Sequence, residues 1–291
     1  MLGELIVLRT KMSSHFSIEF FPAKTDVGAE KLRDVARRLG ALGPEFFSVT
    51  YGAGGSTRDR TLGTVRDVLA LGYDVAPHLS CIGDSKDEVG ELLDLYRSQG
   101  VKRIVALRGD LPSGMGRGLG ELPFAADLVR YIRERHGDHF SIEVAAYPES
   151  HPQSADLATE VKHFVAKANA GADSAITQYF FNADCYFHFV ERVRAAGCDI
   201  PVIPGIMPIT NFANLVRFSD ACGAEIPRWI RKQVASFGDD SVSIQQFGEE
   251  VITRLCRQLL DGGAPGLHFY SMNLAEPTLA LWRNLGLPET R

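Results

Sequence analysis

Short hydrophobic segments alternate with amphipathic segments along almost the whole chain. Runs of β-branched and aromatic residues, typical of buried strands, occur at 16–21, 46–51, 74–80, 103–110, 141–148, 174–181, 200–206 and 266–272. Each run has the length of a strand and is bounded by glycine, proline or polar residues. The pattern therefore predicts eight strands.

The segments between these runs have helical periodicity, for example at 29–42, 86–100 and 125–137. In the second of them, hydrophobic residues recur at the spacing of one buried helix face, at Val89, Leu92, Leu93 and Tyr96. Several of these segments finish at a glycine, which is the usual residue after the last turn of a helix. We expect such C-terminal caps at Gly40, Gly100 and Gly137.

Strands that alternate with helices form a parallel sheet with right-handed connections, and eight strands are the number that closes into a barrel. We therefore predict an α/β fold, a single (β/α)₈ TIM barrel, with extra helices in 207–262 before the eighth strand. We expect one catalytic domain over 15–291 and a loose N-terminal extension over 1–14. A doubly wound sheet is the alternative, but neither a GxGxxG nor a GxxxxGK[ST] motif is present.

The composition is that of an ordinary globular protein, with 45% hydrophobic and 23% charged residues among 291. The net charge of −5 argues against a protein that binds nucleic acid by neutralising phosphates. Five cysteines without a CxxC pair indicate reduced thiols in the cytoplasm. The first twelve residues resemble neither a secretory signal nor a membrane span, because Glu4 interrupts the short apolar segment.

Polar residues stand where the predicted strands end, which is where barrel enzymes carry their active sites. The first of them, Glu19, lies in a run of aromatic and aliphatic residues and must take up a proton or find a partner when buried. A structural ion pair with Arg108 is one possibility. A structural role for His78 and a turn-forming role for Asp110 also remain open.

The chain contains no HExxH motif and no compact group of His, Cys and carboxylate residues, so we expect no metal site. A GxSxG motif for a nucleophilic serine is also absent.

Eight motifs occur in an order that resembles the methylenetetrahydrofolate reductase family: FSIEFFPAK, SVTYGAGGSTRDRT, PHLSCIG, VALRGDLP, AAYPESHP, AGADSAITQYFFNAD, PVIPGIMPITNF and HFYSMN. The resemblance implies an FAD-containing barrel that reduces 5,10-methylenetetrahydrofolate to 5-methyltetrahydrofolate in a ping-pong cycle and so supplies methyl groups for methionine synthesis. It implies NAD(P)H as hydride donor, NADH rather than NADPH, a small reduced folate as substrate and a cytoplasmic homo-oligomer.

The same resemblance assigns site residues. Glu19 falls on the family's general acid, and Asp110 on an aspartate beside flavin and folate. Because the segment around Glu19 is apolar, we expect its pKa to be raised. The implied FAD contacts are Thr50, Tyr51, Ala53, His78, Arg108, Gly109, Asp110, Ala125, Tyr147, His151, Glu160, His163 and Lys167. The implied substrate contacts are Asp110, Gln178, Asn214 and Phe218, although Phe218 could equally belong to a helix core.

Two positions depart from the family pattern. Ala166 replaces a basic residue that some relatives use near the FAD phosphates, and Leu274 replaces an arginine that holds the folate glutamate. Proline dehydrogenase, which shares the flavin barrel, is an alternative. It would lack both the acidic Glu19 and the RGD segment at 108–110, so the sequence disfavours it. A barrel enzyme for sugar phosphates and a folate-binding barrel without flavin are further alternatives.

Overall fold

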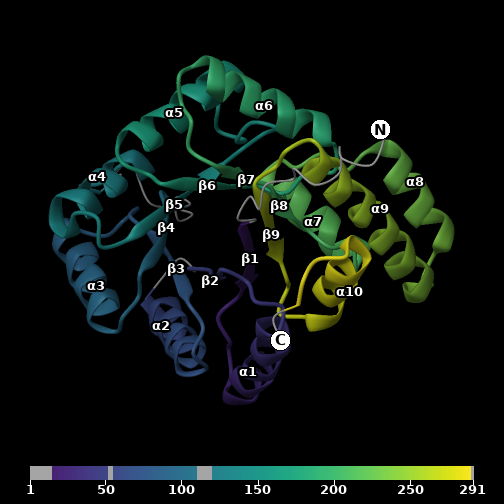
Figure 1. Ribbon diagram of the computed structural model, residues 1–291, viewed down its shortest axis with the longest axis horizontal. Helices are drawn as coiled ribbons and strands as arrows, with labels where there is room; N and C mark the ends of the chain where they lie inside the picture. Colours follow the sequence, from purple (N-terminus) through teal and green to yellow (C-terminus); the bar gives the residue numbers. More distant parts are fainter. Residues whose placement is uncertain (1–14, 52–54, 110–119, 290–291) are drawn as a thin grey trace, which may run out of the picture.

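The computed structural model describes residues 15–51, 55–109 and 120–289, with only the backbone of 55–57. Nine parallel strands stand in the middle of the molecule, and helices surround them (Figure 1). The order of the strands in the sheet is β7-β6-β5-β4-β3-β2-β1-β9-β8. The bounds are β1 His15–Phe20, β2 Phe46–Val49, β3 Val75–Ser80, β4 Arg103–Leu107, β5 Ser141–Ala146, β6 Ser174–Thr177, β7 Val202–Ile203, β8 Gly205–Ile206 and β9 Gly266–Tyr270.

Strands β7 and β8 are two halves of the predicted seventh strand, separated by Pro204. Proline has no N–H group to donate to a neighbouring strand, but the Pro204 carbonyl accepts a hydrogen bond from His268 N–H at 2.9 Å. Because β7 pairs with β6 and β8 pairs with β9, this broken strand brings the two ends of the sheet together. The prediction of an eight-stranded α/β barrel is therefore confirmed.

The helices follow the strands in the expected alternation. Their bounds are α1 Asp26–Gly40, α2 Gly55–Ala70, α3 Lys86–Ser98, α4 Ala125–His136, α5 Leu157–Asn169, α6 Ala183–Ala195, α7 Phe212–Cys222, α8 Arg228–Phe237, α9 Ser241–Asp261 and α10 Ala275–Leu285. Helices α7, α8 and α9 are the extra helices expected before the last strand. None of the helices among the described residues has the length and apolar character needed to cross a lipid bilayer.

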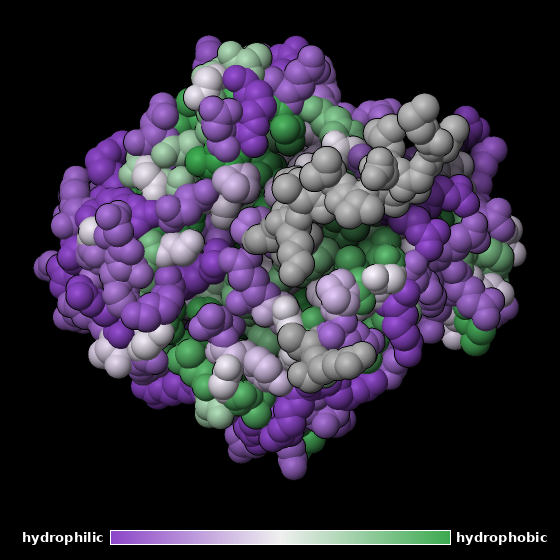
Figure 2. Space-filling view, viewed as in Figure 1, coloured by the Kyte–Doolittle hydropathy of each residue, from purple (hydrophilic) through white to green (hydrophobic). Residues whose placement is uncertain are grey.

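The helices bury their apolar faces and leave polar side chains outside, so the molecular surface in view is largely hydrophilic (Figure 2). Gly100 and Gly137 follow helices with positive φ, as expected for caps. Gly40 does not. It is the last residue of α1, and a Cβ atom there would lie 2.1 Å from the Tyr73 ring, so this glycine makes room for a tyrosine.

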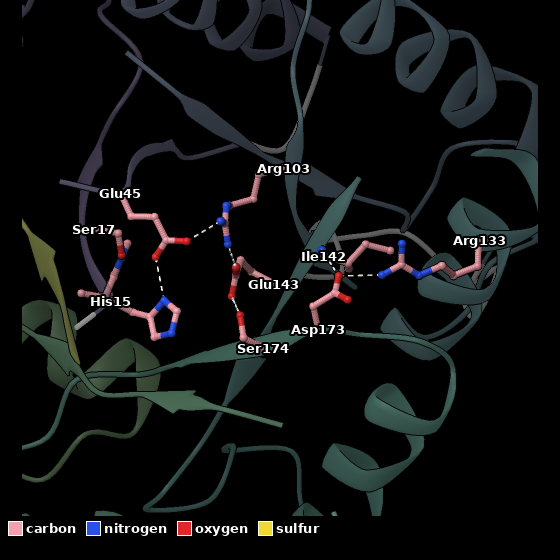
Figure 3. Close-up of polar contacts among 10 residues, drawn as sticks. His15, Ser17, Glu45, Arg103, Arg133, Ile142, Glu143, Asp173 and Ser174 are labelled. Carbon is pink, nitrogen blue, oxygen red and sulfur yellow. Dashed lines mark hydrogen bonds and ion pairs between the residues drawn. The ribbon is translucent and has the colours of Figure 1, made fainter. Parts of the chain in front are cut away.

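Inside the barrel, a charged network closes the end at which the strands begin (Figure 3). Arg103 of β4 donates to Glu143 at 2.5 Å and to Glu45 at 2.6 Å, and Ser174 also donates to Glu143. Glu143 is buried, so these donors are what make its charge tolerable. The opposite end of the barrel, where the strands finish, is left for the functional site.

Candidate active site

A cavity of about 800 Å³ lies between the carboxyl ends of β2 to β5 and helices α4 and α5. Segments far apart in the sequence meet on its wall. The residues predicted to contact FAD that line it are Tyr51, Arg108, Gly109, Ala125, Tyr147, His151, Glu160, His163 and Lys167. The fold therefore places most of the implied cofactor contacts around one cavity.

The turn after β4 shapes one wall of this cavity and requires a glycine. Gly109 has φ +87°, and a Cβ atom there would lie 1.9 Å from Ser80 Oγ. The Ser80 hydroxyl instead donates to the Arg108 carbonyl at 2.9 Å. The Arg108 guanidinium donates to Gln153 Oε1 at 2.5 Å, so this arginine does not form the suggested ion pair with Glu19.

Helix α5 contributes two buried charged residues to the cavity wall. Glu160 and Lys167 are both buried, and Ser154 Oγ donates to Glu160 at 2.6 Å. The Lys167 ammonium donates to the Ala145 carbonyl at 2.5 Å. Desolvation lowers the pKa of Lys167 to about 8, against the opposing effect of Glu160. An anionic group bound in the cavity would favour the protonated, positively charged form of Lys167.

Glu19 lies at the end of β1, beside Ser48 of β2, and its side chain contacts two histidines from other strands. The distances from its Oε2 atom are 3.3 Å to His78 Nε2 and 3.6 Å to His268 Nε2. Both imidazole Nε2 atoms are buried and have no hydrogen-bond partner of good geometry among the described residues. Ser17 Oγ lies 2.7 Å from the other nitrogen of His268 and fixes that ring.

The expectation of a raised pKa for Glu19 is wrong in this environment. Desolvation is the largest effect and does raise the pKa, as the apolar sequence suggested. The contacts with His268 and His78 together outweigh it and lower the pKa from 4.5 to about 2. The two imidazoles therefore favour the ionised form of the Glu19 carboxyl group.

The remaining predicted residues lie elsewhere or cannot be placed. Thr50 and His78 are not on the wall of the cavity, although both lie at the ends of neighbouring strands. Gln178 follows β6, and its side-chain oxygen accepts from Tyr179 N–H. The two α7 residues, Asn214 and Phe218, also lie away from the cavity wall. Asp110 and Ala53 lie outside the described residues.

Phe218 is partly buried and packs against the core, with the Arg217 guanidinium 5.1 Å from the centre of its ring. This contact fits the alternative interpretation of Phe218 as part of a helix core. The substrate role of Phe218 stays a prediction.

Sequence reasoning missed His268, although a signal was present. His268 and Tyr270 are alternate residues of β9, so they point to the same side of the sheet. The β1–β9 register pairs them with Ser17 and Glu19. The Tyr270 hydroxyl donates to the Thr177 carbonyl of β6 at 2.7 Å. Gln153, the partner of Arg108, was also missed.

The part of the chain that the structure describes contains no candidate metal-binding site. No group of three or more His, Cys, Asp or Glu side chains there is placed to hold a metal ion. All five cysteines carry free thiols.

Comparison with known proteins gives one consistent result. The family model described as methylenetetrahydrofolate reductase matches residues 6–286. The chain is 38% identical to the 5,10-methylenetetrahydrofolate reductase of Escherichia coli over 272 residues, 93% of this chain and 90% of that protein. It is 35% identical to methylenetetrahydrofolate reductase (NADH) 1 of Arabidopsis thaliana over 94% of this chain and 48% of that protein.

A solved structure from Clostridium thermocellum, described as binding two copies of 5-methyl-5,6,7,8-tetrahydrofolic acid, superposes with a TM-score of 0.66 at 18% identity. The alignment covers 93% of this chain and 95% of that one, and at this identity it supports the fold alone. The sequence matches extend over nearly the whole barrel, including every strand that borders the cavity. The chain therefore belongs to the methylenetetrahydrofolate reductase family.

Proposed function

We propose that this protein reduces 5,10-methylenetetrahydrofolate to 5-methyltetrahydrofolate, with NAD(P)H as hydride donor and FAD as cofactor. The observation that carries the proposal is one cavity lined by most of the implied flavin contacts, with the Glu19–His78–His268 cluster at a neighbouring strand end. A barrel of this family with both features fits the family's reaction. The product would supply methyl groups for methionine synthesis.

The residues of the cavity fit an FAD-sized ligand. Its volume falls within the range of cofactor sites. Arg58, Arg108 and Lys167 supply cations for a diphosphate, and Glu160 supplies an acceptor for ribose hydroxyls. At Gly109 the missing side chain lets a flat ring approach the backbone. When bound, FAD would take a hydride from NAD(P)H and pass it to the folate in a ping-pong cycle.

The Glu19 cluster would supply the proton that opens the folate's five-membered ring. In this proposal Glu19 takes up a proton in the folate complex and delivers it to the bridging nitrogen, with His78 and His268 positioned against its carboxyl group. When the Ser17 hydroxyl donates to His268 Nδ1, the Nε2 atom carries the hydrogen that faces Glu19. Asp110 is assigned to stabilise the cationic folate on the family resemblance alone.

Separate measurement of the two half-reactions tests this function. The purified protein should show flavin absorption that NADH bleaches and methylenetetrahydrofolate restores. Glu19→Gln should keep the NADH step and slow the folate step by at least about 100-fold, the size of a general acid–base contribution. If both steps slow equally, Glu19 is structural and the assignment fails.

Three finer properties belong to the same proposal. They are a preference for NADH, a homo-oligomeric assembly and a cytoplasmic location. The plant relative named with NADH supports the first, and the free thiols support the last. Comparing kcat/KM for NADH and NADPH, and light scattering of the purified protein, would decide the first two.

A further inference from the structure

The turn that follows β9, residues 271–274, has an unusual backbone. Met272 and Asn273 are consecutive non-glycine residues with φ of 54° and 56°. Side chains disfavour this left-handed region, although asparagine tolerates it better than most. Strain of this kind persists where the surroundings hold the backbone in place, and it gathers at functional sites.

Hydrogen bonds to the end of β1 hold this turn. The Asn273 side chain accepts from Phe21 N–H at 2.8 Å and donates to the Phe21 carbonyl at 3.0 Å. Ser271 Oγ donates to the Glu19 carbonyl at 2.6 Å and accepts from Asn273 N–H at 3.2 Å. The turn is therefore fastened to the backbone on both sides of Phe20, directly after Glu19.

These bonds replace a step of strand pairing. The β1–β9 ladder ends with the Glu19–Tyr270 pair, beyond which the two chains separate. An asparagine side chain carries the same donor and acceptor as a peptide group, so Asn273 continues the pairing by one more step at Phe21. Aspartate could accept from Phe21 N–H but could not donate to its carbonyl, and glycine could do neither.

We propose that Asn273 is a positioning residue: it holds the strained turn against the end of β1 and thereby fixes the Glu19 carboxylate against His78 and His268. The inference rests on the proposed function, in which Glu19 acts on the folate. Asn273 itself is not required to touch the substrate. Its effect is on where the Glu19 side chain sits.

Two variants separate positioning from simple stability. Asn273→Gly removes both side-chain hydrogen bonds and also relieves the left-handed strain, so the protein should remain folded. Asn273→Asp keeps only the acceptor, so its effects should lie between those of the wild type and those of Asn273→Gly. Ser150→Gly is the matched control for strain, because Ser150 is also left-handed at φ 70° and its N–H donates to the Tyr147 carbonyl, away from β1.

Hydrogen exchange followed by mass spectrometry gives a readout that does not depend on catalysis. In Asn273→Gly, the amide of Phe21 should exchange roughly three- to tenfold faster, since one hydrogen bond is lost. Ser150→Gly should leave that amide unchanged. The folate half-reaction of Asn273→Gly should slow about 10- to 100-fold through misplacement of Glu19, while the NADH half-reaction keeps its rate.

An unchanged exchange rate at Phe21, or an unchanged folate step in a folded Asn273→Gly protein, would overturn the inference. Equal slowing of both half-reactions would also overturn it, because a general loosening of the barrel would then be the cause. If the wild-type protein does not reduce the folate at all, the proposed function fails. The exchange measurement still decides in that case whether Asn273 holds the end of β1.

Discussion

The carboxyl group of Glu19 should stay ionised throughout the neutral and mildly acidic range. Its pKa falls from 4.5 to about 2 because two imidazoles outweigh the cost of burial. A group with a lowered folded-state pKa contributes stability above its unfolded pKa and loses it as the pH falls through the folded value. At about 1.4 kcal/mol per unit, this shift corresponds to about 3 kcal/mol.

The assay is urea unfolding of the wild type and of Glu19→Gln over a series of pH values. The difference in free energy of unfolding should shrink as the pH falls below about 4, where the carboxyl group begins to take up a proton. The glutamine keeps the shape of the side chain and removes its charge, so the difference reports the ionised carboxylate. The ¹³C signal of the Glu19 carboxyl carbon, assigned by its absence in Glu19→Gln, should show no titration from about pH 5 to about pH 8.

The opposite pH dependence would refute this reasoning. If the pKa were raised toward neutrality, the wild type would lose stability relative to Glu19→Gln as the pH rises from about 5 to about 8. A carboxyl carbon that titrates in that interval would lead to the same conclusion. Burial in an apolar environment, as the sequence suggested, would then determine the pKa of Glu19 more than its two histidine neighbours do.

Three further outcomes follow from the cavity and its rim. Gly109→Ala should lower the free energy of unfolding by at least about 1–3 kcal/mol in urea titrations, because φ is +87° and the new Cβ meets Ser80 Oγ. Ala166→Arg should tighten FAD binding to the apoprotein in a fluorescence titration, and salt should weaken the gain, since Ala166 is exposed on the cavity wall. Leu274→Arg should lower the folate KM about tenfold at low salt by adding a cation at an exposed rim position; an unchanged KM would place the folate glutamate elsewhere.

Hydrophobic periodicity was sufficient to predict the barrel, but it did not predict where the strands stop. The run at 174–181 was expected to be one strand, yet β6 ends at Thr177. Tyr179, Phe180 and Phe181 are buried without belonging to a strand. They are hydrophobic because they pack beneath the helices, and a sequence pattern records burial rather than strand pairing.

The position of Glu19 at a strand end could be predicted, but its partners could not. Which side chains face it depends on the register between β1 and its neighbours, and a shift of one residue would turn His268 away from the interior. Local sequence carries little information on this register in a parallel sheet. The suggested partner, Arg108, instead donates to Gln153, which also lines the cavity, and the resemblance assigns His78 to the flavin alone.

The two expectations for Glu19, its role as an acid and its raised pKa, are separable. The pKa was inferred from burial alone, which raises it, whereas the partner contribution has the opposite sign and is larger in total. A carboxylate whose pKa is lowered by its neighbours can still deliver a proton, provided that it takes one up when the folate binds. The structural unit at the end of β1 is then the cluster of Glu19, His78 and His268, and the pKa of Glu19 depends on the cluster rather than on the local sequence alone.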